Sequence, residues 1–351
     1  MDVQFNCLSG VGQLGTFTYM SLEYYGHALG ALGRSLAEWN KTPDDYDLMT
    51  VVMLDIFETL FMPESSINGA HAQGMAHILR LRGHEQFHNP RGWGLFRLAH
   101  HRVQKQHLAK QLNPLPESQN WLEMLNDNIA SVKLEKDGLA VNQICQQAND
   151  LLSHIDDENI QTCQLLDLVN EMLRLDQDAT HWRKKPEWDF QTRSRDEILG
   201  NNEPEFWLPG TIQLHPDLWM AYEWNYHRTA RIILHQKLIA CLDRVDAATP
   251  SGPRVGTRME SVVTVQSLAS EILSTVPQSF GDIDHLGRWH PGSKTARWQA
   301  VGAYLLLWPI KIIKDQSAFT TNSQKTDAQR VFDRIRECTG MKSNLGALSE
   351  I

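Results

Sequence analysis

Cysteine is scarce in this chain of 351 residues, which has only five and no C-x-x-C pair. They are widely separated, at Cys7, Cys145, Cys163, Cys241 and Cys338. An odd number of dispersed cysteines excludes a disulfide framework and a cysteine-based zinc cluster as the feature that organises the fold. We therefore expect reduced thiols in an intracellular protein.

Positive charge is in deficit. The chain has 33 Lys and Arg residues against 42 Asp and Glu residues, which gives a formal net charge of −9. Proteins bind nucleic acids non-specifically through cations that meet the phosphates, so this balance provides no general attraction to nucleic acid or to anionic lipid. We predict that this chain does not bind nucleic acid directly.

Long apolar runs are also missing. The most apolar run, VGAYLLLWPIKII at 301–313, is shorter than the roughly 20 residues that span a bilayer, and it contains Pro309. The first residues, MDVQFNCLSGVGQLG, lack the basic and apolar regions of a signal peptide. We expect a soluble chain without membrane association, and the 42% hydrophobic content allows a substantial core.

Apolar residues recur with a period near 3.6 along most of the chain, whereas strand-like alternation is rare. This pattern predicts an all-α fold, an irregular bundle of about ten to twelve helices in a single domain over 1–351. Surface connections are expected at about 183–213 and 245–258, where Pro, Gly and charged residues gather. The helices are predicted over 19–39, 46–62, 67–82, 92–111, 121–132, 139–155, 160–175, 215–245, 259–275, 296–315, 326–338 and 342–349.

One short stretch matches a catalytic motif. His84-Glu85-Gln86-Phe87-His88 has the H-E-x-x-H spelling of zinc proteases, in which two histidines one helical turn apart share a zinc ion and the glutamate acts as general base. That chemistry needs a helix. Gly83 is expected to end the preceding helix, and Asn89-Pro90 delays the next one, so we interpret the match as a turn between helices.

A second pattern has the spacing of a magnesium site. Asn149, Ser153 and Asp157 are spaced by four residues and resemble the Asn, Ser and acid series of class I terpene cyclases, where oxygen ligands hold magnesium and diphosphate. The companion acidic cluster would be DDYD, with Asp44, Asp45 and Asp47. The series ends in Asp instead of Glu, and TPDDYD is typical of a helix start.

Other candidate residues have simpler interpretations. His100 and His101 point about 100° apart on a helix and cannot chelate one metal ion by themselves. The basic stretch HWRKKPEW at 181–188 resembles a nuclear import signal or a nucleic-acid contact, but acidic neighbours favour a solvated loop. Because G-x-S-x-G, phosphate-loop and G-x-G-x-x-G motifs are all missing, catalysis has little support and we predict no cofactor.

The segment 215–245 is the strongest helix and the most unusual one. Trp224, Asn225, Arg228 and Arg231 place polar groups among Trp, Tyr and Ile side chains. A buried polar group needs a partner or costs several kcal/mol. These residues are either the polar contacts of a small-molecule pocket or internal struts that hydrogen-bond to neighbouring elements, and we favour the struts.

Five phrases, taken in order, resemble the regulatory domain of fungal zinc-cluster transcription factors over nearly the entire chain from about residue 15. They are YYGHALGALGRSL (24–36), AHAQGMAHILRLRGHEQF (70–87), WNYHRTARIILHQKLIACL (224–242), ILSTVPQSFG (272–281) and YLLLWPIKII (304–313). His84-Glu85-Gln86-Phe87 occupies the loop that follows LRLRG in this family, where the family carries no zinc site. The resemblance implies a nuclear or nucleocytoplasmic regulatory protein, controlling metabolic or secondary-metabolite genes.

The chain also departs from that family. Its members usually begin with six closely spaced cysteines that hold two zinc ions and read DNA, whereas Cys7 is the only cysteine among the first hundred residues here. We therefore expect regulation through other regulatory proteins or a DNA-binding partner, with a small-molecule effector as a further partner. The other expectations for a regulatory role are a missing N-terminal exon that encodes the zinc cluster and a decoy that occupies a partner's surface. The alternative is a related helical fold recruited to small-molecule binding or catalysis, such as a magnesium-dependent cyclase.

Overall fold

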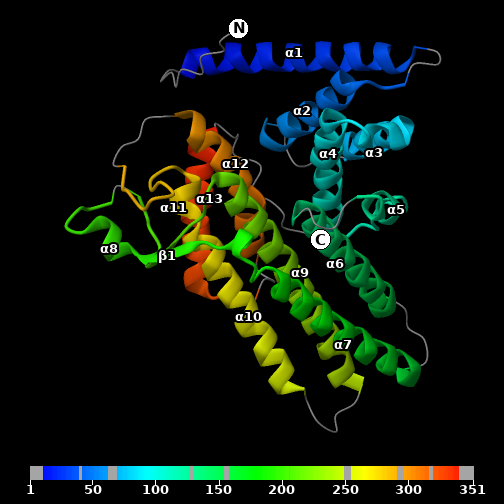
Figure 1. Ribbon diagram of the computed structural model, residues 1–351. Coiled ribbons are helices and arrows are strands. Elements are labelled where there is room, and N and C mark those ends of the chain that lie inside the picture. Colours follow the sequence, from blue (N-terminus) through cyan, green and yellow to red (C-terminus); the bar gives the residue numbers. More distant parts are fainter. Residues whose placement is uncertain are drawn as a thin grey trace. The chain divides into compact units, whose positions relative to one another are not determined.

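The computed structural model describes residues 11–38, 42–61, 69–125, 130–153, 158–204, 206–248, 254–290, 296–315 and 319–339. Helices form nearly all of its regular structure, beside one two-stranded sheet, so the predicted all-α class is confirmed (Figure 1). The chain divides into two compact units, Met1–Val103 and Gln104–Ile351, where the sequence analysis expects one domain. Within the described helices, none has both the length and the apolar content that a bilayer-spanning segment needs.

The first unit contains α1 (Val11–Leu36), α2 (Asp45–Phe61), α3 (Ala70–Arg82), the 3₁₀ helix η2 (Gly83–Phe87) and the first part of α4 (Pro90–Ala109). α2 starts at the end of TPDD, as that segment predicts. The capping side chain is Asp44, whose Oδ1 accepts hydrogen bonds from the backbone N–H groups of Tyr46 and Asp47 at 2.8 and 3.0 Å. The apolar stripe of α2 is buried, but Met53 is 55% exposed. α2 therefore packs one side against the rest of the first unit and leaves an apolar side chain exposed on another.

Polar side chains join the helices of the first unit. The Tyr25 hydroxyl on α1 donates to Glu58 Oε1 on α2 at 2.6 Å and lies 3.1 Å from His71 Nε2 on α3. Asp55 on α2 pairs with Arg102 on α4, and both side chains are nearly buried. Because these bonds link residues far apart in sequence, they fix the rotation of each helix against its neighbours.

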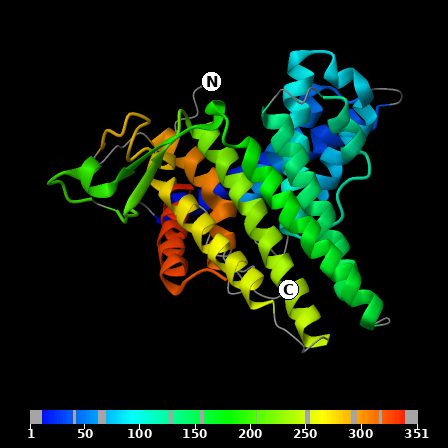
Figure 2. The same ribbon diagram turned by 60° about the horizontal axis from the view of Figure 1, so that its bottom comes forward.

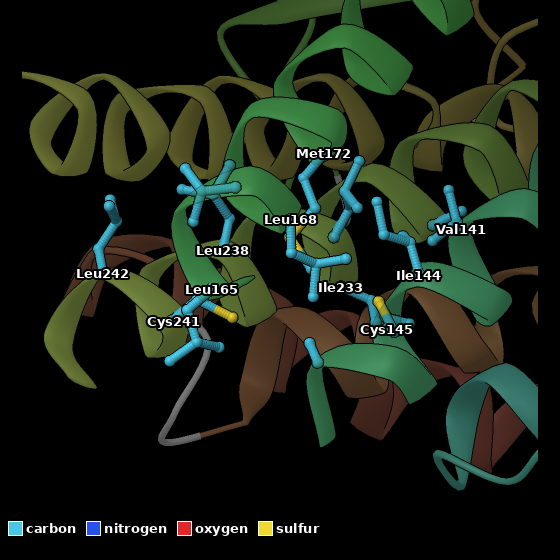
Figure 3. Close-up of a cluster of buried hydrophobic side chains, with 14 of the residues drawn as sticks. Val141, Ile144, Cys145, Leu165, Leu168, Met172, Ile233, Leu238, Cys241 and Leu242 are labelled. Atoms are coloured by element: carbon cyan, nitrogen blue, oxygen red, sulfur yellow. The ribbon is translucent and has the colours of Figure 1, made fainter. Parts of the chain in front are cut away.

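The second unit is organised around α9 (Leu218–Ala248), an uninterrupted helix of 31 residues. The other elements are α5 (Ser118–Glu123), α6 (Ala130–Ser153), α7 (Glu158–Trp182), α10 (Val255–Ser274), α11 (Val276–Ser279), α12 (Ala296–Lys314) and α13 (Asn322–Thr339). Figure 2 shows α6, α7, α10 and α12 running alongside α9, which contacts all four. Apolar side chains of α6, α7 and α9 form a buried cluster in this unit, with Met172, Leu238 and Cys241 fully buried (Figure 3).

The segment 183–213 differs from the predicted surface connection. It contains η3 (Pro186–Trp188), β1 (Gln191–Ser194), α8 (Arg195–Leu199) and part of β2 (Thr211–Leu214), with β1 antiparallel to β2. Trp188 is 1% exposed and Ile212 is fully buried. Strands of four residues are too short to give a recognisable alternation, which is why the sequence showed none.

Several predicted helix bounds also change. The prediction of one helix over 121–132 is wrong, because α5 ends at Glu123 and the next two described residues are not helical. The helix expected over 139–155 begins nine residues earlier, and the one over 160–175 continues to Trp182. Those predicted over 296–315 and 326–338 are confirmed as α12 and α13, with Pro309 inside α12. The helix predicted over 342–349 lies outside the described residues.

Candidate functional site

The polar residues predicted on α9 lie at its junction with α7, α10 and the β-hairpin. Asn225 is 2% exposed and Arg228 is fully buried, so their polar atoms have exchanged water for protein partners. Arg231 lies on the α7 side of the same helix, with a side-chain exposure of 16%. The four residues singled out by the sequence therefore belong to one buried region.

Arg228 donates hydrogen bonds to three different elements. Its Nε donates to Glu271 Oε2 on α10 at 3.0 Å, and its Nη2 donates to Gln213 Oε1 on β2 at 2.6 Å. Its Nη1 donates to Asn225 Oδ1, one turn earlier on α9, at 3.2 Å. Burial lowers the pKa of Arg228 to about 10, with Glu271 partly opposing the shift. The guanidinium thus stays charged at neutral pH and ties α10 and β2 to α9.

Asn225 extends this network to the end of α10. Its Nδ2 donates to Thr275 Oγ1 at 2.8 Å, and Thr275 Oγ1 in turn donates to the backbone carbonyl of Ile272 at 2.8 Å. Gln278 adds a neighbouring clamp, because it accepts from the backbone N–H of His215 and donates to the carbonyl of the same residue. The network holds the turn between α10 and α11 against α9 and β2.

Aromatic rings and a second arginine surround Trp224. Its Nε1 donates to the backbone carbonyl of Trp188 at 3.0 Å. The guanidinium carbon of Arg183 lies 3.7 Å from the Trp188 ring centroid and 5.0 Å from that of Trp224, and Phe190 packs edge-on to Trp224. These cation–π contacts stabilise a charged group that is 4% exposed. Burial lowers the pKa of Arg183 to about 9.

Arg231 completes the site on the side of α7. Its Nε and Nη2 donate to the two oxygens of Asp176 at 2.6 and 3.0 Å, and His235 Nε2 lies 3.4 Å from Asp176 Oδ1. Burial by itself would raise the pKa of Asp176, but the neighbouring His235 and the two hydrogen bonds from Arg231 outweigh it and hold this pKa well below its usual range. The carboxylate therefore stays ionised and bridges α7 and α9.

The arrangement agrees with the interpretation of these residues as struts. Each of the four predicted side chains makes at least one hydrogen bond that crosses to another element. The partners were missed by sequence reasoning because they lie on separate elements and share no spacing with α9; they are Gln213, Glu271, Thr275, Asp176, Arg183 and Trp188. A shallow cleft of about 400 Å³ lies in the first unit instead, between Tyr46 and Arg91.

The H-E-x-x-H stretch does not form the helix that a zinc protease needs. Gly83 ends α3 with a φ of 55°, and residues Gly83–Phe87 form a single 3₁₀ helix in place of the predicted loop. His84, Glu85 and His88 are exposed. Side chains three residues apart are aligned in a 3₁₀ helix, so the four-residue spacing of the two histidines does not place them on one face.

The residues of the magnesium series make local structural contacts. Asn149 Oδ1 accepts a hydrogen bond from the Lys237 ammonium on α9, and the Ser153 hydroxyl donates to the backbone carbonyl of Asp150. Asp157 lies outside the described residues. In the acidic cluster, Asp45 pairs with Arg82 at 2.6 Å and with Arg91 at 2.8 Å. Across the described part of the chain, no three His, Cys, Asp or Glu side chains are grouped to hold a metal ion.

The remaining candidates have structural roles. His100 is 1% exposed and stacks on Phe96 with ring centroids 5.2 Å apart, whereas His101 is half-buried. In the basic stretch 181–188, Lys184 and Lys185 are exposed but Arg183 and Trp188 are buried. The prediction that the whole stretch is a solvated loop is therefore wrong, because Arg183 and Trp188 pack against Trp224.

Comparisons with known proteins add no family to this description. A scan against protein-family models found no match, and searches of curated proteins and of solved structures found none.

Two buried histidines beside this network make the stability of the second unit depend on pH. Burial, followed by the nearby Arg228 and Arg183, lowers the pKa of His215 to about 3, and burial lowers the pKa of His227 well below its usual range. Both stay neutral in the folded protein, whereas in the unfolded chain they bind protons below about pH 6.5. The free energy of unfolding should therefore fall by about 1.4 kcal/mol per histidine between pH 7.5 and 5.5.

Urea unfolding of the His215→Gln variant, followed by tryptophan fluorescence, measures this effect. The free energy of unfolding changes between pH 7.5 and pH 5.5, and this change should be about 1.4 kcal/mol smaller in the variant than in the wild-type protein. The exposed His285 provides the matched control, and His285→Gln should keep the full difference. Equal pH dependence of the His215→Gln variant and the wild-type protein would show that His215 titrates normally in the folded state.

Proposed function

We propose that this chain is a transcriptional regulatory protein of fungal type, which acts in the nucleus through protein partners and controls metabolic or secondary-metabolite genes. The proposal rests on the resemblance of its five phrases to fungal regulatory domains. A small-molecule effector is a further partner that this class of function would use.

The observation that carries the proposal is the role of the residues in those phrases. In the third phrase, Asn225, Arg228 and Arg231 bond α9 to the turn after α10, to β2 and to α7. In the second and fourth phrases, Gly83 and Gly281 have positive φ angles of 55° and 76° at chain turns. A resemblance carried by residues that the architecture needs supports a shared fold. The regulatory function is inferred from that resemblance by analogy, because a fold alone does not determine a function.

Charge supports regulation through proteins over direct DNA binding. The net charge of −9 opposes the phosphate contacts that dominate affinity for DNA. We expect the purified chain to show no sequence-specific DNA binding in a gel-shift assay. A salt-resistant complex at nanomolar concentration would contradict this part of the proposal.

A tethering experiment tests the regulatory function itself. The chain is fused to an unrelated DNA-binding domain and expressed in a fungal host with a reporter that carries the matching site. We expect reporter activity to change several-fold relative to the DNA-binding domain alone, and a fluorescent fusion of the chain to accumulate in the nucleus. Activity that stays at the level of the DNA-binding domain, together with exclusion from the nucleus, would refute the proposal.

The matched variants are Gly302→Ala and Gly256→Ala. Gly302 is in contact with the backbone of α11, so alanine there should disrupt the second unit and abolish the effect on the reporter. Gly256 faces open space, and its alanine variant should act like the wild-type chain. Equal reporter effects of the two variants at equal protein levels would mean that the folded second unit is not required.

A further inference from the structure

α1 exposes a line of leucines that no described residue of the first unit covers. Leu22, Leu29 and Leu36 are 44%, 38% and 40% exposed. Positions seven residues apart drift by only about 20° around a helix, so the three side chains lie along one line. A repeat of seven with leucine at one position is typical of a helix that packs lengthwise against another helix.

The contacts of α1 with α2 and α3 fix where this line points. Tyr25 bonds to Glu58 and His71, and its ring stacks on Phe57 with centroids 5.2 Å apart. The other partly buried positions after Tyr25 are 28, 32 and 35, one helix face. At 100° of rotation per residue, the leucine line is next to this packed face on the helix surface but does not belong to it.

Beyond the leucine line, the surface of α1 is formed by small residues. Side chains built at Gly26 and Gly33 would meet no atom within 4 Å, and one at Gly30 would meet only Arg34 Nη1, at 3.5 Å. A glycine inside a helix costs roughly 0.5–1 kcal/mol relative to alanine. Among the described residues of the first unit, no other element fills the room that these glycines leave, whereas a second helix could approach closely there.

Charge identifies the second helix. Glu23 and Arg34, both exposed, lie on the side of the glycines away from the leucines. In an antiparallel pair of α1 helices related by a two-fold axis, each side of the contact face lies opposite the same side of the other copy. The leucines of one copy therefore contact the leucines of the other. If the helices cross between residues 28 and 29, each Glu23 faces the Arg34 of the other copy. A parallel pair would place these charges against leucines.

We propose that α1 is a homodimerisation helix, which pairs antiparallel with α1 of a second copy through Leu22, Leu29 and Leu36, with Glu23–Arg34 ion pairs across the two-fold axis. The occupant is a second copy because this face is complementary to itself in apolar pattern and in charge. One helix pair is small beside interfaces of about 1,200 Å² or more, so the dimer should dissociate at micromolar concentrations.

Sedimentation velocity of the full chain, from about 1 to 100 µM, tests the proposal. We expect a concentration-dependent species of twice the monomer mass, and Leu29→Glu should raise the dissociation constant at least tenfold. Gly33→Leu should do the same by blocking close approach, in a position where the monomer has room. Tyr24→Glu is the matched control, because Tyr24 is 68% exposed on another side of α1.

Charge reversal tests the antiparallel arrangement. Glu23→Arg and Arg34→Glu should each weaken the dimer several-fold, and the double variant should restore it. A monomer at 100 µM, as when another part of the chain covers α1, would overturn the proposal. A dimer that Leu29→Glu leaves intact would place the interface elsewhere. A dimer that Leu29→Glu weakens, but whose dissociation constant neither Glu23→Arg nor Arg34→Glu changes, would overturn the antiparallel pairing.

Discussion

Replacing Gly302 by alanine is expected to lower the free energy of unfolding of the second unit by at least about 3 kcal/mol, the upper range of overpacking effects. Gly302 lies in α12, where a methyl group would overlap the backbone carbonyl oxygen of Ser279 at the end of α11. Backbone atoms cannot rotate away as a side chain would. α11 must therefore separate from α12, which disturbs the turn that Asn225 and Thr275 hold against α9.

Gly256→Ala is the control, because a methyl group there meets no atom within 4 Å. Alanine favours helix over glycine, so this variant should be neutral or up to about 1 kcal/mol more stable. Urea unfolding monitored by tryptophan fluorescence measures both variants under the same conditions. Wild-type stability of the Gly302→Ala variant would mean that α11 and α12 are less closely packed than the structure has them.

Long helices were predictable because their signals are local. The apolar period of 3.6 identified α9 and α12, the segment TPDD gave the start of α2, and Gly83 gave the end of α3. Each signal is contained in a few neighbouring residues. Predicted ends were least accurate where polar residues continue a helix, as in the last turns of α7. Tertiary contacts, such as those of Asp176, support those turns, and local propensity does not reveal them.

The partners of the site residues were not predictable from the sequence. The sequence indicated that Asn225 and Arg228 on α9 require hydrogen-bond partners, since both lie among apolar residues. The identity of those partners depends on how β2 and α10 pack against α9. Gln213 and Glu271 are 15 and 43 residues from Arg228 in sequence, so no local pattern relates them to it. The close approach at Gly302 is likewise a fact of packing between helices.

Replacing Arg228 by methionine should destabilise the second unit by about 2–6 kcal/mol, because two buried acceptors are left without their donor at about 1–3 kcal/mol each. Gln213 and Asn225, 6% and 2% exposed, would lose their donor, and the Glu271 carboxylate would face a methionine. Arg228→Lys keeps the charge but not the fork of donors that reaches three acceptors, so it should recover only part of the loss.

Arg258→Met is the matched control, since Arg258 pairs with Asp243 between the same helices α9 and α10 at 2.9 Å, with side-chain exposures of 40% and 52%. Removing that exposed ion pair should cost no more than about 1 kcal/mol. Adding Glu271→Gln to Arg228→Met should restore part of the stability, because the unpaired carboxylate is then neutral. Urea unfolding of the four variants measures each step of this comparison.

The same variants separate a strut from a binding residue. If Arg228 holds helices together, its variants lose stability, and reporter activity in the tethering experiment falls only in proportion to the folded protein that remains. If Arg228 instead binds an effector, Arg228→Lys would keep most of the stability and lose the regulatory response. The three hydrogen bonds of Arg228 to β2, α9 and α10 favour the first outcome. A nitrogen of Arg228 that turned to an effector would leave Gln213, Asn225 or Glu271 without its hydrogen-bond donor.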